Sequence, residues 1–154
     1  MSNQLDFKYD DGGRELAGFK GHTGDCVLRS IVIATSRDYA TTRLELMQAQ
    51  KEFTQNYQGK KYRQKGNSVF RGLHRPVYEK YLEDLGWYWT PTMQIGSGCK
   101  VHLLKDELPN EMIIACVSKH LVAVDHGKIR DIDNPSRNGK RCVYGYYRKA
   151  TDSS

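Results

Sequence analysis

Residues 21–35 read GHTGDCVLRSIVIAT, and they hold the clearest structural signal in this chain. Two glycines suit a turn, and Asp25 after them is a favoured residue at the start of a helix. The apolar residues beyond it recur at helical spacing, which predicts a buried helix from about Asp25 to Thr35. These apolar residues are Val27, Leu28, Ile31, Ile33 and Ala34.

Cys26 falls in the first turn of this predicted helix. The unpaired N–H groups and the positive end of the helix dipole there favour a thiolate over a thiol. Cys26 is therefore a candidate nucleophile if a histidine reaches it. The alternative is a small buried apolar residue, because free cysteine is among the most buried residue types.

Length and composition predict one domain over residues 1–154, and the order of its expected helices and strands makes its fold class α+β. The chain has 154 residues, 38% of them hydrophobic, which is enough to bury a core. We expect residues 1–20 to form an extended lead-in outside the core and residues 149–154 a frayed tail. Helices are expected over about 39–56 and from Arg75-Pro76 to Gly86, with one short helical turn within 100–108. Strands are expected at 87–89, 112–117, 120–124, 128–132 and 142–148, so that three helices precede an antiparallel sheet.

The compartment and the redox state follow from what the sequence lacks. No apolar segment follows a basic start, and no run approaches the length of a membrane span, so we expect a cytoplasmic protein that does not enter a membrane. The cysteines form no CxxC pair and lie far apart, so all four are expected to be free thiols. They are Cys26, Cys99, Cys116 and Cys142.

The net charge of +6 is concentrated in residues 57–75, which hold six cations and no acid. Residues 57–73 have no periodicity and predict a long loop, of a length that usually serves a function or is disordered. Interleaved cations and aromatic rings are typical of single-stranded nucleic-acid binding, although such charge runs are usually solvated loops. An acidic protein partner, or a flap that recruits an acidic substrate, fits the same charges. The cations are Lys60, Lys61, Arg63, Lys65, Arg71 and Arg75.

His120 is the best candidate base for Cys26. It opens one strand of a predicted hairpin whose return strand carries Asp131 and Asp133. With a two- or three-residue turn, one of these acids becomes a direct or diagonal neighbour of His120. An acid there would fix the imidazole tautomer and stabilise the imidazolium. The alternative is a surface histidine beside solvated acids.

The other histidines fit the role of base less well. His74 and His126 are expected to face solvent, and His102 lies in a segment without a clear pattern. His22 is too close to Cys26 in sequence to act easily as its base, although it suits the lining of a site.

Several motifs resemble those of papain-like cysteine peptidases. Gly24-Asp25-Cys26 resembles the Asp-Cys start of bacteriocin-leader peptidases in that superfamily. The run HLVAV…IRD, which starts at His120, resembles their histidine hairpin and that of bacterial cell-wall endopeptidases with the same core. The order GHTGDC…GWYWTP…GSGC…HLVAV…NPSRNG…CVYGYYRK is also similar to a family of small uncharacterised bacterial and phage proteins.

The resemblance implies a papain-like core and a thiol hydrolase acting on a peptide or isopeptide bond, either bacterial or phage-encoded and acting in a bacterial host. Cys26 would be the nucleophile, His120 the general base and acid, and Asp131 the orienting acid, with Asp133 as its alternate. The backbone N–H of Cys26 would help to bind the oxyanion, and no cofactor is implied.

One position departs from the superfamily pattern. A glutamine often stands six residues before the cysteine as the second oxyanion donor, and Lys20 stands there in this chain. The candidates to replace it or to line the site are His22, Asp25 and Gln94. Loss of such a donor costs a factor of roughly 10²–10³ in rate, which leaves open a weak enzyme.

Two other kinds of protein remain open at this point. An inactive papain-like scaffold would bind protein or nucleic acid through residues 57–75, since a fold does not settle activity. The pairs Cys99-x-x-His102 and Cys116-x-x-x-His120 have spacings superficially like those of zinc sites. On one continuous strand Cys116 and His120 would stand about 13 Å apart, too far for one ion unless Ser118-Lys119 bends the chain. We therefore expect no metal.

Overall fold

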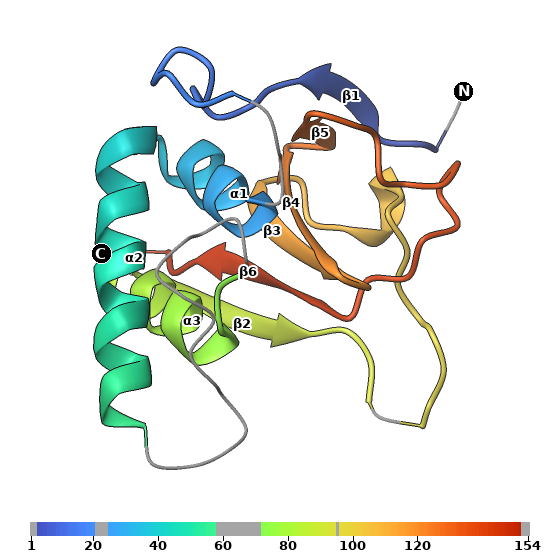
Figure 1. The fold of residues 1–154 in the computed structure, drawn as a ribbon. Helices are drawn as coiled ribbons and strands as arrows, with labels where there is room; N and C mark the ends of the chain where they lie inside the picture. The colour runs from blue at the N-terminus through green and yellow to red at the C-terminus, as the bar shows by residue number, and fades with distance from the viewer. Residues whose placement is uncertain (1–2, 21–24, 58–71, 95, 152–154) are drawn as a thin grey trace.

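The computed structural model describes residues 3–20, 25–57, 72–94 and 96–151, and these form an α+β fold (Figure 1). A six-stranded sheet has the strand order β1-β5-β4-β3-β6-β2. The helices are α1 (Cys26–Thr35), α2 (Tyr39–Asn56) and α3 (Arg75–Asp84), with a short 3₁₀ turn, η2 (Lys105–Glu107). The strands are β1 (Asp6–Tyr9), β2 (Trp87–Pro91), β3 (Met112–Val117), β4 (His120–Asp125), β5 (Lys128–Asp131) and β6 (Gly145–Lys149).

The sheet is buried on both faces around its centre. All three helices lie on one side of it (Figure 1), where α1 packs Leu28 and Ile31 against Ile114 and Leu121. The opposite face of β3 and β4 packs against Leu103 and other residues of the coil segments. Two buried faces explain why β3 reads as the continuous apolar run MIIACV rather than as an alternating pattern.

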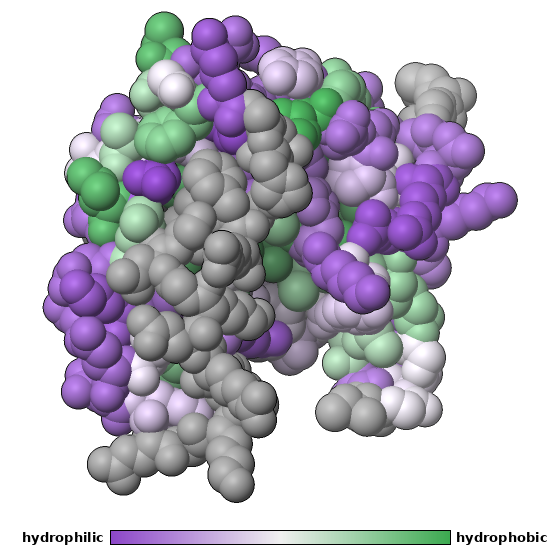
Figure 2. Space-filling view, in the orientation of Figure 1, coloured by the Kyte–Doolittle hydropathy of each residue, from purple (hydrophilic) through white to green (hydrophobic). Residues whose placement is uncertain are grey.

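The helix boundaries follow from local sequence. Asp38 accepts a hydrogen bond from the N–H of Thr41 at 2.9 Å and so caps α2. Pro76 lies in the first turn of α3, where its missing N–H is not needed. The outer surface of the second half of α2 is hydrophilic (Figure 2), as an amphipathic helix at the surface requires. The three helices and the strands β3, β4 and β5 confirm the segments predicted from sequence, to within one or two residues.

The predicted role of residues 1–20 is wrong, because this segment contains a strand. β1 pairs in parallel with β5, so the sheet is mixed rather than antiparallel. Leu5, just before β1, is 6% exposed and belongs to the core. All four β1 side chains are exposed, the apolar Phe7 and Tyr9 included, so the strand is held mainly by its backbone pairing with β5.

The predicted free state of all four cysteines is also wrong. Cys99 and Cys142 form a disulfide across 43 residues of sequence, while Cys26 and Cys116 are free. The backbone bridge between His102 and Cys142 brings the two segments together, and this pairing has no local sequence signal. Disulfides persist mainly in oxidising compartments, so the expected cytoplasmic location stays a prediction.

Three smaller predictions need correction. His74 is 6% exposed and contacts the ring of Phe53, because it begins α3 from inside the helical layer rather than facing solvent. The last strand begins at Gly145 rather than at Cys142. Glycine is needed at position 145, because a Cβ on that residue would lie 2.2 Å from Cζ2 of Trp89 and clash with the ring. Lys149 was predicted to begin a frayed tail, but it is the last residue of β6 and is therefore paired in the sheet.

Some predictions fall outside the described residues. They concern His22, most of the loop at 57–73 and its cations Lys60, Lys61, Arg63, Lys65 and Arg71. Among the helices in the described ranges, none has both the length and the apolar composition needed to cross a bilayer.

Candidate active site

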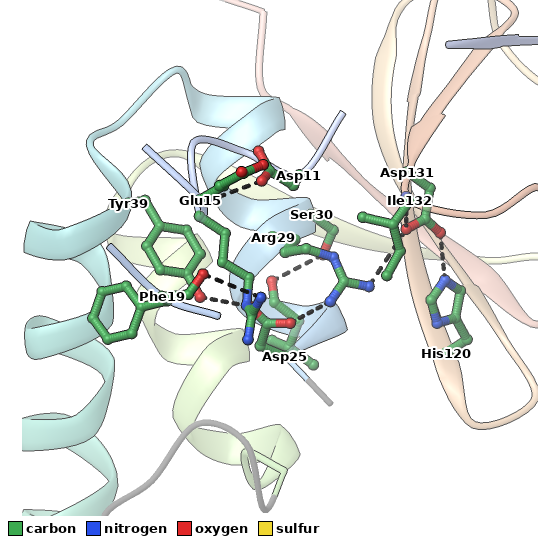
Figure 3. Close-up of polar contacts among 12 residues, drawn as sticks. Asp11, Glu15, Phe19, Asp25, Arg29, Ser30, Tyr39, His120, Asp131 and Ile132 are labelled. Carbon is green, nitrogen blue, oxygen red and sulfur yellow. Dashed lines mark hydrogen bonds and ion pairs between the residues drawn. The ribbon is translucent and has the colours of Figure 1, made fainter. Parts of the chain in front are cut away.

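The candidate nucleophile, Cys26, is the first residue of α1, and Asp25 is its N-cap. The Asp25 side chain does not cap the helix but turns into the protein, where it is 1% exposed. There it pairs with Arg29, lies 3.4 Å from Nε of Arg14 and accepts a hydrogen bond of 2.5 Å from the Tyr39 hydroxyl (Figure 3). Asp25 therefore stabilises the start of α1 through these buried contacts, and its side chain does not line the site.

The hairpin of β4 and β5 brings His120 and Asp131 together. Nε2 of His120 lies 2.7 Å from Oδ2 of Asp131, and Figure 3 shows the two side chains pointing toward each other. Ala123 pairs with Arg130, so Asp131 is the diagonal neighbour of His120, one of the arrangements expected from a short turn. Asp133 lies beyond the end of β5 and is exposed. Within the described residues, the carboxylate that bonds His120 is that of Asp131.

The other oxygen of Asp131 is also held. Oδ1 accepts a hydrogen bond of 2.7 Å from the backbone N–H of Ile132 and lies 3.4 Å from Nη2 of Arg29. Asp131 is 5% exposed, so these contacts hold a buried carboxylate in one orientation.

His120 and Cys26 shift each other's titration. Burial alone would lower the pKa of His120, but its hydrogen bonds to Asp131 and Cys26 outweigh burial and raise the pKa to about 9. Burial alone would raise the pKa of the Cys26 thiol. Hydrogen bonds from His120 and from the backbone N–H of Leu121, together with nearby Arg29, outweigh it and lower that pKa. The site thus favours a thiolate beside an imidazolium.

The His120 ring interacts with both Asp131 and Cys26. Its Nε2 atom bonds Asp131. Cys116, the second free cysteine, has the opposite character. Burial raises its pKa, and the neighbouring Cys26 raises it further against the effect of Arg75.

A cavity of about 710 Å³ opens over Cys26 and His120. Its walls come from the start of α1, the turn between β3 and β4, the end of β5 and the loop that follows it. The lining residues are Cys26, Arg29, Ser118, Lys119, His120, Asp131, Ile132, Asp133, Pro135, Arg137 and Arg141.

The candidate oxyanion donor Gln94 lies away from this cavity, and so does Lys20. Gln94 is exposed in the loop after β2, where its N–H donates to Oγ of Ser97 at 3.1 Å. Lys20, which stands at the superfamily's usual glutamine position, is exposed and lines a separate hollow with Phe19. Neither contributes to the walls around Cys26 among the residues described.

The two cysteine–histidine pairs considered for zinc behave differently. Cys99 is consumed by its disulfide and so offers no thiolate ligand. The chain does turn at Ser118-Lys119, which places Val117 opposite His120. Even so, over the described ranges no three histidine, cysteine, aspartate or glutamate side chains come together as a metal site.

Several elements of the site were not predicted from the sequence. Arg29 contacts both Asp25 and Asp131. The sequence feature that could have revealed it is a charged residue four positions after Asp25 in a mostly apolar helix. The backbone N–H of Leu121, which lowers the pKa of Cys26, cannot be recognised from residue type, because every residue except proline carries this group. The cations Arg137 and Arg141 stand in a polar loop whose position depends on the whole sheet.

Comparisons with known proteins do not identify a relative. No family model matches the chain, and neither the curated proteins nor the solved structures give a significant match. The fold shown is α+β, and the resemblance to papain-like peptidases stays a prediction.

Proposed function

We propose that this protein is a thiol hydrolase with a papain-like core, acting on a peptide or isopeptide bond through Cys26, His120 and Asp131. The observation that carries the proposal is the contact of 2.7 Å between His120 and Asp131 in the cavity that Cys26 also lines, where His120 lowers the pKa of the Cys26 thiol. A nucleophile, a base and a group that orients the base are the minimum set for covalent catalysis.

The reaction would begin with attack of the Cys26 thiolate on the substrate carbonyl carbon, forming a C–S bond and an oxyanion. The N–H groups at the start of α1 would stabilise that oxyanion. The His120 imidazolium would give its proton to the leaving nitrogen as the C–N bond breaks, producing a thioester and a free amine. Neutral His120 would then take a proton from water, whose oxygen attacks the thioester and releases an acid and Cys26. Asp131 would hold the ring throughout.

Alkylation by iodoacetamide, followed by mass spectrometry of each cysteine, tests the thiolate–imidazolium pair. Wild type and His120→Ala are compared between pH 5 and 9, with Cys116 as an internal control for a buried thiol. We expect Cys26 to react fast at pH 6, and the variant to react at least about tenfold more slowly, since one pKa unit is a tenfold change in thiolate fraction. Equal reactivity of Cys26 and Cys116, or reaction of Cys26 only above pH 8, would overturn the proposal.

Turnover is tested separately. Wild type should hydrolyse members of a peptide library that Cys26→Ala leaves intact. A reactive Cys26 without hydrolysis of any peptide or isopeptide would favour the alternative, a papain-like scaffold that binds partners through residues 57–75. The exposed Lys20 at the position of the usual glutamine is the feature that favours that alternative.

A further inference from the structure

The walls of the candidate active site carry three cations that the proposed reaction does not use. Lys119 comes from the turn between β3 and β4, and Arg137 and Arg141 come from the loop after β5. Within the part of the chain that the structure describes, no acid lies within ion-pair distance of any of the three. Asp131 is already bonded to His120 and Arg29, so Asp133 is the one remaining acid among the lining residues. The cavity therefore has an excess of positive charge.

Arg141 is fixed in place rather than free to move with solvent. Its Nη2 donates to the carbonyl oxygen of Ser118, and its Nη1 lies 3.5 Å from the carbonyl oxygen of Pro135. These two bonds hold its guanidinium between the β3–β4 turn and the opposite loop. Burial and the nearby charge of Arg137 lower the pKa of Arg141, which means that its positive charge is incompletely compensated. An anion beside it would relieve that cost.

A guanidinium held in a fixed orientation is suited to a planar carboxylate. We propose that this cavity selects a substrate with a carboxylate next to the scissile bond, bound by Arg141 with Arg137 and Lys119. The inference rests on the proposed hydrolase function and names the substrate class of the same site. The carboxylate has two sources in peptides, an acidic side chain or a chain terminus.

Two alkylating reagents of nearly equal size measure the field at Cys26. Iodoacetate is an anion and iodoacetamide is neutral, so the ratio of their rates at Cys26 reports the positive charge around the sulfur. Lys119 and Arg137 both have positive φ, 58° and 53°, which asparagine tolerates better than most residues. Lys119→Asn and Arg137→Asn therefore remove charge with little backbone strain. Lys140→Gln is the matched control, an exposed cation of the same loop outside the lining residues.

We expect each of Lys119→Asn and Arg137→Asn to lower the iodoacetate-to-iodoacetamide ratio by about two- to fivefold at low salt, and Lys140→Gln to leave it unchanged. Added salt should lower the wild-type ratio toward that of the Lys119→Asn/Arg137→Asn double variant. An unchanged ratio in both single variants, while iodoacetamide still reacts fast with Cys26, would overturn the carboxylate proposal alone. Slow reaction of iodoacetamide with wild-type Cys26 at pH 6 would instead count against the hydrolase proposal.

Three small peptides separate the two sources of carboxylate by how strongly they protect Cys26 from iodoacetamide. N-acetyl-aspartyl-alanine amide carries only a side-chain carboxylate, and N-acetyl-asparaginyl-alanine carries only a terminal one. N-acetyl-asparaginyl-alanine amide carries neither and is the control. Stronger protection by one of the acidic peptides, lost in Arg141→Gln and in the Lys119→Asn/Arg137→Asn double variant, identifies the source. Equal protection by all three would contradict the proposal.

Discussion

Nη2 of Arg29 lies 3.4 Å from Oδ1 of Asp131, which joins the helix that carries the candidate nucleophile to the strand that carries the orienting acid. The same guanidinium pairs with Asp25 at the start of α1. Arg29 is 3% exposed, so one buried cation neutralises carboxylates on two separate elements. Arg29 thus couples the helix that carries Cys26 to the strand that carries the partner of His120.

Replacing Arg29 should destabilise the whole fold. Arg29→Gln leaves buried Asp25 with Arg14 as its remaining cation, and breaking a buried ion pair typically costs about 3–5 kcal/mol. Urea unfolding followed by circular dichroism measures the loss. Arg37→Gln is the control, because its pair with Glu45 is partly exposed and is worth less than about 1 kcal/mol. Equal losses in the two variants would show that the buried pair has no special weight.

The pKa of His120 should depend on Asp131 rather than on Asp133. Asp131→Asn removes a charged hydrogen-bond partner, so the pKa of His120 falls from about 9 by roughly 1–3 units and the pKa of Cys26 rises. NMR titration of the His120 ring and the pH profile of Cys26 alkylation measure the two shifts. Asp133→Asn should leave both unchanged. If Asp133→Asn has the larger effect, Asp133 is the orienting acid.

Turnover, once a substrate is found, should decline at alkaline pH. His120 carries a proton below about pH 9 and loses it above that value, so the proton for the leaving amine becomes scarce there. We expect kcat/KM to fall above about pH 9, and also at acid pH as the Cys26 thiolate is protonated. Cys26→Ala removes both interactions by which Cys26 raises the pKa of His120, so the His120 ring should titrate at lower pH than in wild type. A ring titration that is the same in both proteins would contradict the Cys26–His120 contact.

The Cys99–Cys142 disulfide should stabilise the protein without entering the site. It closes 43 residues of chain, and loops of this size typically contribute about 2–4 kcal/mol. Cys99→Ser/Cys142→Ser should lower the free energy of unfolding by that amount, whereas Cys116→Ser serves as a single-thiol control. Thiol titration of the unfolded, unreduced protein should detect the two free cysteines. A count of four would show that the bridge does not form.

The elements that sequence reasoning predicted well are those with a local signal. The helix at Cys26–Thr35 and the strand at Met112–Val117 each carry their own apolar pattern. The His120–Asp131 pair was within reach because a short hairpin turn limits the registers available to it.

The features that were missed depend on distant partners. β1 has exposed side chains and forms through its pairing with β5, supported by the ion pair of 2.7 Å between Asp10 and Arg130. The backbone N–H of the buried His74 donates a hydrogen bond of 2.8 Å to the side chain of Gln50 in α2. Neither contact can be read from the residues next to it in sequence.

The distance along the chain between the two halves of the candidate site has a consequence for synthesis. Arg29 and Asp131 are 102 residues apart in sequence, and His120 also belongs to the later half. At about 5–20 residues per second, a ribosome takes roughly 5–20 s to pass from one to the other. During that interval Cys26 has no base and no orienting acid beside it. The nascent chain therefore carries an ordinary thiol, and the reactive thiolate arises only once the last third of the protein has been made and has paired with α1.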